Sequence, residues 1–413
     1  ISCHNACNFF PESGVFACSL LLGAPMADLL TPPQDAPTTD IGQPGVGERQ
    51  SDIFALLCRE GPMSRQDLHR RTGWRPNTVG TMVDQMIRGG LLREGDAVSS
   101  GPGRPARPLE IDPVRRDVLG VMIGSEQVSI CRLNLHGQQL SPTRTRRVAD
   151  ASAVDEAVKL LRGEDASRLV AVGVSLPGLF DRSSRQLLMS SLSPSGDAAS
   201  LQPLFDVFPQ VPIHLGNCAQ NLAVHYALSS PTPPQGLMML LHLRDGSVGA
   251  AALLDGQPIH GSVSSDWNLG HVRLPVETEP CYCGQRGCVE RVFSSAYYAA
   301  HIRSRKATTL MEAIGRYSGD DPALEDLTEL FAMAVGSGIS QFAPHQFVLS
   351  TGFNAATQYV NHLCARIRAN TMPVLADRFR LDLWDLPSVD FARAGAWLAL
   401  GSLHGLTGEP AGR

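Results

Sequence analysis

The first regular pattern of apolar and polar positions is helical and covers residues 49–90. Its first apolar residues recur three and four positions apart, on one face of a helix that Gly61-Pro62 ends. Ser64 is an N-cap for a short second helix, which Gly73 stops. A third helix carries an apolar face of valine, methionine and isoleucine and ends at Gly89-Gly90. Three short helices with a tight turn before the third are typical of a helix-turn-helix.

The next twenty residues predict a small hairpin. Residues 91–94 and 109–111 have the composition of strands, and the Gly/Pro-rich loop at 99–105 joins them. A hairpin directly after a helix-turn-helix is the wing of a winged helix-turn-helix. We therefore expect residues 48–112 to form one winged helix-turn-helix domain.

From residue 118 onward the pattern changes to buried strands. Residues 118–124 form a continuous apolar run, and residues 128–135 alternate between apolar and polar positions. An amphipathic helix follows at 153–161, and a further buried strand at 169–174. Two strands, a helix and another strand in this order predict an α/β lobe.

The overall composition is that of an ordinary soluble globular protein. The chain has 413 residues, 43% apolar and 18% charged, with a net charge of −5, and this length permits two or three domains. The seven cysteines outside residues 281–288 show no paired spacing, which favours a reducing cytoplasm, and no apolar run approaches the ~20 residues of a membrane span. We expect residues 1–47 to be a disordered leader, with 1–25 an over-extended start or a poorly ordered tail.

The strongest local signal is a cluster of metal-binding side chains. His271, Cys281, Cys283 and Cys288 lie within eighteen positions and match the Cys₃His set of a tetrahedral structural Zn²⁺ site. The alternatives are a disulfide or unconnected core thiols. A Cys281–Cys283 bridge would be strained, and three cysteines leave one unpaired, so the spacing favours zinc.

The same segment resembles the signature of a known family. His271 after a glycine, the Cys-x-Cys-Gly-x-x-Gly-Cys-x-Glu run that ends at Glu290, and Ser294 are similar to the motif of the ROK family (repressors, open reading frames, kinases). The resemblance implies a two-lobed actin-like (ribonuclease H-like) fold of class α/β. It also implies either a sugar kinase or a sugar-responsive transcription regulator.

The resemblance sets expected domain boundaries. It implies a first lobe at 113–235, a second lobe with the zinc site at 236–388, and a C-terminal helix at 389–413 that returns to the first lobe. Residues 48–112 look like the winged helix-turn-helix of the family's repressors, whose wing carries a Gly-Arg-Pro sequence. A homodimer, or a dimer of dimers, is the expected assembly.

The predicted winged helix-turn-helix domain has residues suited to binding double-stranded DNA. The start of its third helix and its wing carry side chains that hydrogen-bond base edges or phosphates: Arg75, Asn77, Thr78, Thr81 and Arg104. Between residues 48 and 116 there are twelve arginines and nine acids, so this region is locally positive although the chain is negative. The alternative is a small helical bundle that contacts another protein.

Three elements that a kinase of this family needs are altered. Met122 stands where an aspartate helps to place magnesium, and Cys218 stands where an aspartate acts as the general base for the sugar hydroxyl. The glycine-rich nucleotide loop keeps Gly352 alone. We therefore expect a regulator without enzyme activity, with a diverged sugar kinase as the alternative.

The family's sugar pocket is also altered but remains polar. By resemblance its residues are Ser191, Asn217, Asn268, His271 and Glu290, in which Ser191 and Asn268 replace an asparagine and a glutamate. His271 would bind zinc through one ring nitrogen and offer the other to a ligand hydroxyl. Two hypotheses stay open: the pocket takes a sugar or sugar-like effector, or it is empty and the chain binds DNA constitutively.

Overall fold

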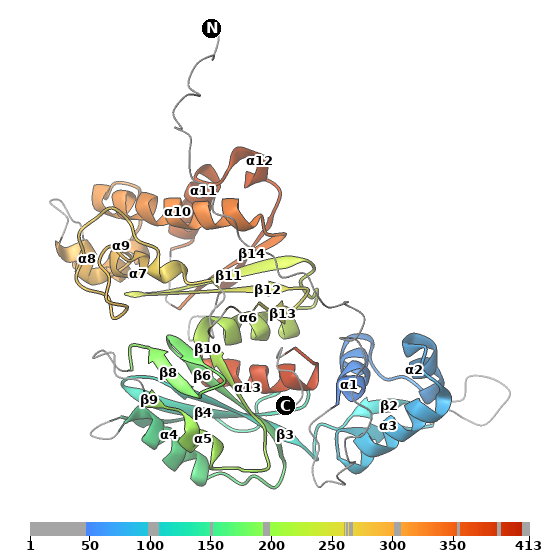
Figure 1. Cartoon of the computed structure of the whole chain (residues 1–413). Coiled ribbons are helices and arrows are strands. Elements are labelled where there is room, and N and C mark those ends of the chain that lie inside the picture. The colour runs from blue at the N-terminus through green and yellow to red at the C-terminus, as the bar shows by residue number, and fades with distance from the viewer. Residues whose placement is uncertain are drawn as a thin grey trace, which may run out of the picture. The chain divides into compact units, whose positions relative to one another are not determined.

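All helices and strands of the computed structural model that are given below lie within residues 43–413 (Figure 1). No helix in the described part combines the length and the apolar character that crossing a membrane requires. The residues that the structure describes are 47–97, 107–148, 152–192, 199–259, 261, 263, 267–300, 307–352, 356–385 and 390–406.

The N-terminal elements confirm the predicted three helices and two strands. Ser64 caps the second helix by accepting from the amide of Asp67, and Gly73 ends that helix in the left-handed conformation. Pro76 begins the third helix, where its fixed φ is already helical. The wing loop that contains Arg104 lies outside the described residues. The elements are α1(Glu48–Glu60), α2(Arg65–Thr72), α3(Pro76–Arg88), β1(Leu92–Glu94) and β2(Leu109–Ile111).

A five-stranded sheet follows, in the order β10-β6-β3-β4-β5. Its centre is parallel, because β3 and β10 both run alongside β6 in the same direction, and its β4–β5 edge is antiparallel. The short helices and a three-stranded sheet of β7, β8 and β9 complete this part. The elements are β3(Asp117–Ile123), β4(Gln127–Asn134), β5(Arg144–Arg147), α4(Ala153–Arg162), β6(Leu169–Leu176), β7(Leu179–Asp181), β8(Gln186–Met189), β9(Ala199–Ser200), α5(Gln202–Phe205) and β10(Ile213–Asn217).

A second five-stranded sheet has the order β13-β12-β11-β14-β15. Its strand β11 pairs antiparallel with β12 and parallel with β14, and helices from the later sequence cover one face (Figure 1). The strands are β11(Leu237–Arg244), β12(Ser247–Leu254), β13(Gln257–Pro258), β14(Gln346–Thr351) and β15(Arg380–Asp385). The helices are the 3₁₀ helix η1(Leu269–His271), α7(Val289–Val292), α8(Ser295–Ala300), α9(Leu310–Gly315), α10(Pro322–Phe342), α11(Thr357–Ala369) and α12(Pro373–Ala376).

Two helices, α6(Cys218–Ser229) and α13(Phe391–Leu403), lie between the two large sheets (Figure 1). Helix α13 contacts β3, β6 and α6, and α6 contacts β11 and β12. The fit against the first sheet is close enough to require glycine: a side chain at Gly120 or Gly173 would overlap the backbone of α13. The chain is therefore a mixed α/β protein in which α13, near its C-terminal end, packs on the first sheet.

This close approach predicts that Gly173→Ala destabilises the fold. Its new methyl group would overlap the carbonyl oxygen of Gly395, so α13 has to move, at a cost of about 1–3 kcal/mol. The control is Gly163→Ala, whose methyl group would meet only ordinary contacts at the exposed end of α4 and should change stability by less than ~1 kcal/mol. Urea unfolding measures both, and equal stability of the two variants would contradict the account.

Candidate metal centre and ligand pocket

The four predicted metal ligands meet in one place. Their ligand atoms all lie within 4.8 Å of one another. His271 comes from η1, Cys288 is the N-cap of α7, and the other two thiols lie in the loop between these elements. Gly287 permits the turn, because it has a φ of +78° and a side chain there would press against the carbonyl oxygen of Leu274.

The spacing of these atoms fits a tetrahedral metal site. Zinc bonds of ~2.3 Å to sulfur and ~2.0–2.1 Å to nitrogen place two sulfurs about 3.8 Å apart, and a sulfur and a nitrogen about 3.6 Å apart. Cys283 Sγ and Cys288 Sγ are separated by 3.5 Å, and Cys281 Sγ and His271 Nδ1 also by 3.5 Å. The cluster could therefore bind a metal ion, and its soft sulfur donors suit Zn²⁺.

Burial around the cluster raises the pKa values of the Cys281 and Cys288 thiols, which favours their protonated forms unless a cation is bound. It raises the pKa of Cys288 to about 11 and raises the pKa of Glu290 above its usual range. The thiol of Cys281 donates to Glu290 Oε1 at 3.0 Å. A bound divalent cation would displace the thiol protons, and Glu290 would then orient the neighbouring ligands.

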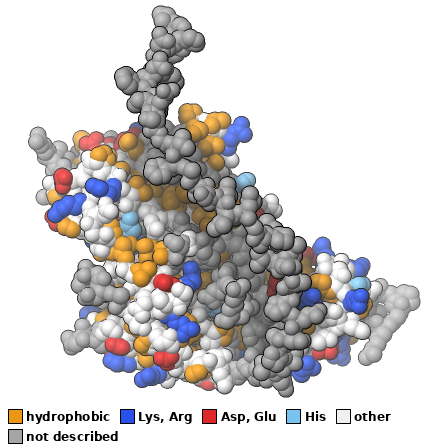
Figure 2. Space-filling view, in the orientation of Figure 1, with side chains coloured by type: hydrophobic (Ala, Val, Ile, Leu, Met, Phe, Trp, Pro, Cys, Tyr) orange, Lys and Arg blue, Asp and Glu red, His pale blue; other side chains and the backbone are white. Residues whose placement is uncertain are grey.

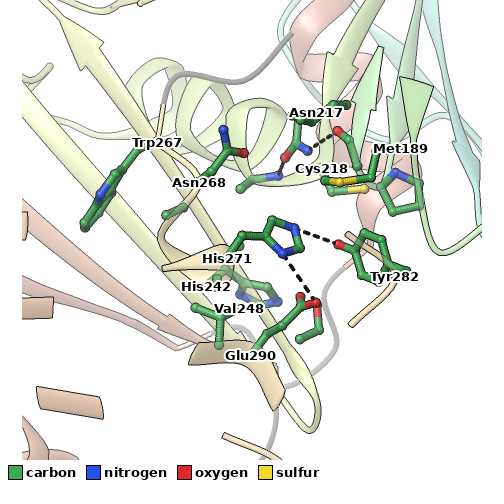
Figure 3. A pocket seen from close by; sticks show the side chains of 18 of the residues that line it. Met189, Asn217, Cys218, His242, Val248, Trp267, Asn268, His271, Tyr282 and Glu290 are labelled. Atoms are coloured by element: carbon green, nitrogen blue, oxygen red, sulfur yellow. Dashed lines mark hydrogen bonds and ion pairs between the residues drawn. The ribbon is translucent and has the colours of Figure 1, made fainter. Parts of the chain in front are cut away.

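His271 connects the metal cluster to a pocket. Its Nδ1 faces Cys281, whereas its Nε2 lies 3.2 Å from the hydroxyl of Tyr282 (Figure 3). From the sequence we expect this second nitrogen to face a ligand hydroxyl; in the structure the hydroxyl of Tyr282 is its partner. Tyr282 lines the pocket and was not among the expected ligand residues, although it lies between two of the predicted metal ligands.

The pocket has a volume of about 90 Å³ and brings together four of the five expected ligand residues, namely Asn217, Asn268, His271 and Glu290 (Figure 3). Ser191 is exposed and is not among the lining residues; Met189 lies there instead. The side chain of Asn217 also caps α6, because it accepts from the amide of Ala219 and donates to the carbonyl of Gly178. Trp267 and His242 line the pocket too, and no local sequence pattern marks them.

Two sulfur atoms lie together where a kinase needs carboxylates. The thiol of Cys218 lies 3.8 Å from the thioether of Met122. Burial raises the pKa of Cys218 to about 12, so the thiol stays protonated at neutral pH. Neither side chain can hold magnesium or accept a hydroxyl proton in the way that an ionised aspartate does.

The expected DNA-contacting side chains lie along the first turns of α3. Arg75, Asn77 and Thr81 are exposed, and Thr78 is half-buried. The hydroxyl of Thr81 donates to the carbonyl oxygen of Asn77. Basic side chains are visible on the surface over this helical region (Figure 2).

The metal centre predicts the effect of removing one ligand. Cys283→Ser should reduce bound zinc from about one ion per chain to nearly none and lower the melting temperature, because a structural metal contributes folding free energy. The matched control is Cys364→Ser, a half-buried thiol of α11 outside the cluster, which should retain the metal. Atomic absorption and thermal unfolding test this, and unchanged zinc content in Cys283→Ser would exclude the site.

Comparisons with known proteins agree with this architecture. The family model described as "ROK family" matches residues 118–386. The DNA-binding transcriptional dual regulator NagC of Escherichia coli (strain K12) is 23% identical over 254 residues, which cover 59% of this chain and 62% of the regulator's length. An N-acetyl-D-glucosamine kinase of Erwinia tasmaniensis is 25% identical over 276 residues, covering 62% of this chain and 90% of the kinase.

A solved structure supports the same fold. The crystal structure of a ROK family transcriptional regulator, described as a homolog of the E. coli MLC protein, superposes with a TM-score of 0.71. It covers 86% of this chain and 96% of that chain at 20% identity, so the likeness concerns the fold. Because the family model spans most of the sequence and the fold agrees, the chain belongs to the ROK family.

Proposed function

We propose that this chain is a DNA-binding transcription regulator of the repressor type that responds to a sugar-like effector and has no kinase activity. One observation carries the proposal: the helices α1, α2 and α3, with exposed polar side chains at the start of α3, precede the region that matches the ROK family. In this proposal residues 48–112 bind an operator, residues 113–235 and 236–388 form the sensing lobes, and residues 389–413 link them. A homodimer would present two such units to two half-sites.

The polar start of α3 suits the major groove of DNA. Arg75 and Asn77 precede or begin the helix, and Thr81 follows one turn later, so the three side chains line one end of α3. Arginine and asparagine form bidentate hydrogen bonds to guanine and adenine edges. Arg104 lies in the Gly/Pro-rich loop of the predicted wing, from which it would contact the minor groove, where negative potential is strongest.

The N-terminal helices α1, α2 and α3 share a hydrophobic core with the first sheet and α13, which couples them to the first lobe. Buried side chains of α1 pack in the same cluster as Val118 and Leu133 of the first sheet and Leu400 of α13. A polar link adds to this: the guanidinium of Arg116 donates to Gly89 O at the end of α3 and to Ser167 O in the lobe. A change in the angle between the two lobes would therefore move α3, the proposed DNA-recognition helix.

The pocket would transmit ligand binding to this core. At about 90 Å³ it is smaller than the ~300–1,000 Å³ of typical small-molecule sites, so a hexose-sized effector requires the lobes to separate. Phe391, the first residue of α13, lines this pocket. Effector binding would then shift α13 and favour one lobe angle over the other. The zinc ion, held by His271 and the three cysteines, would keep the His271 side of the pocket rigid.

The alternative function is sugar phosphorylation, because similar proteins include kinases. The protonated Cys218 and the neighbouring Met122 argue against it. We predict that a coupled assay with ATP, Mg²⁺ and a panel of hexoses detects no turnover above the protein-free blank. Turnover that rises with both hexose and protein concentration would make the chain an enzyme and remove this part of the proposal.

The DNA-binding proposal predicts the effect of Arg75→Ala. Removing this guanidinium should cost about 1–3 kcal/mol of operator affinity, or ~5- to 150-fold. Arg59→Ala is the matched control, because Arg59 is an exposed arginine at the far end of α1, and it should bind the operator nearly as the wild type does. Fluorescence anisotropy measures both, and equal losses in the two variants would mean that only general positive charge matters.

A further inference from the structure

A separate cavity of about 350 Å³ lies at the junction between the N-terminal helices and the first lobe. One side is formed by α1, the turn that follows it and β2, and the other side by α6, α13 and the turn after β4. It shares no described lining residue with the pocket beside His271. Its volume lies within the range of ~300–1,000 Å³ that small-molecule sites typically occupy. The cavity is therefore a second candidate binding site.

Most of the wall of this cavity is apolar. Leu57 of α1, Ile111 of β2 and Leu400 of α13 are buried side chains in its lining. Among the described residues that line it there is no lysine or arginine, and Glu110 is the one carboxylate. Glu110 is already paired with Arg93 at 3.0 Å. Such a lining disfavours an anion, which would lack a counter-charge, and a polyol, whose hydroxyl groups would lack partners.

The imidazole of His404 adds no charge to the cavity. Burial lowers the pKa of His404 to about 4, so the ring is neutral at pH 7. Its Nε2 lies 3.6 Å from the sulfur of Cys58, which lines the α1 side. A neutral imidazole, an indole and a thiol are groups that pack favourably against an aromatic ring.

Trp397 of α13 supplies a hydrogen-bond donor to the same wall. Its Nε1 is shielded from solvent and has no hydrogen-bond partner among the described residues. The indole is held in place, because it stacks on His225 at 5.1 Å between ring centres and a side chain at Gly137 would overlap it. A buried donor without a partner is costly, so a bound molecule that brings an acceptor to this N–H would be stabilised.

We propose that this cavity binds an uncharged aromatic molecule of one or two rings, whose hydrogen-bond acceptor takes the N–H of Trp397. The ring would pack between Leu57 and Leu400, in contact with both the N-terminal helices and α13. The inference goes beyond the proposed function, because the site and the ligand class differ from those of the sugar-like effector. In the proposed regulator the bound molecule would restrain the N-terminal helices relative to the first lobe.

Titration of the full chain, followed by ligand-observed NMR, tests the proposal with acetophenone and α-methylstyrene. The two probes have the same shape, and only acetophenone carries an acceptor, its carbonyl oxygen. We expect both to bind, and acetophenone about threefold or more tightly, because it alone can accept from the indole. Benzoate, an anion of similar size, should bind less tightly than either. Absence of binding by both neutral probes, equal affinity for the two, or tighter binding of benzoate would overturn the proposal.

Trp397→Phe tests the part played by the indole. Phenylalanine keeps an aromatic ring but has no N–H, so α-methylstyrene should still bind and the preference for acetophenone should disappear. The matched control is Trp384→Phe, because Trp384 is a half-buried tryptophan outside the cavity lining, and this variant should keep the preference. A preference that survives in Trp397→Phe would refute the proposed hydrogen bond.

Cys58→Phe locates the binding by filling the α1 side of the cavity. Both neutral probes should lose at least about tenfold in affinity, whereas Asp52→Phe, at an exposed position of the same helix outside the lining, should bind them as the wild type does. Thermal unfolding checks that both variants fold. Wild-type affinity in Cys58→Phe would place the probes elsewhere and refute the site. These titrations contain no DNA, so their outcome is independent of the proposed operator binding.

Discussion

The close contact of α13 with the first sheet is the constraint on which the rest of the structure depends. Gly120 and Gly173 have no side chain, so the backbone of α13 lies directly against β3 and β6. The same helix packs on α6, joins the core of the N-terminal helices, and begins at Phe391, which lines the ligand pocket. Helix α13 therefore touches the first sheet, α6, the core of the N-terminal helices and the ligand pocket.

The metal cluster would play a matching part on the opposite wall of the pocket. The loop between η1 and α7 contains two glycines with positive φ, Gly284 and Gly287, which turn it so that three thiols and His271 converge. His271 and Tyr282 then face the pocket from a segment that a metal ion would hold in place. In the proposed regulator the ligand therefore meets one wall that metal coordination would fix and one wall formed by the first residues of α6 and α13.

Local patterns in the sequence predicted the local structure well. Ser64, Gly73 and the apolar spacing gave the N-terminal helices, because caps and periodicity act within a few residues. The metal ligands lie within eighteen positions of one another, so their spacing could also be recognised in the sequence. The sequence does not mark His242 or Trp267 in this way, because the pairing and packing of distant strands bring them to the pocket. Ser191 was assigned by resemblance alone, in a region where the resemblance is weak, and the structure leaves it outside the pocket lining.

The most direct test of the central claim is DNA binding by the unmodified full chain. Fluorescence anisotropy would compare a duplex from upstream of its own gene with a scrambled duplex of the same length, at several salt concentrations. The account predicts affinity for the upstream duplex ~10³-fold or more above that for the scrambled one, falling steeply as salt rises. Equal affinity for the two duplexes at physiological salt would contradict the assignment of this chain as a transcription regulator.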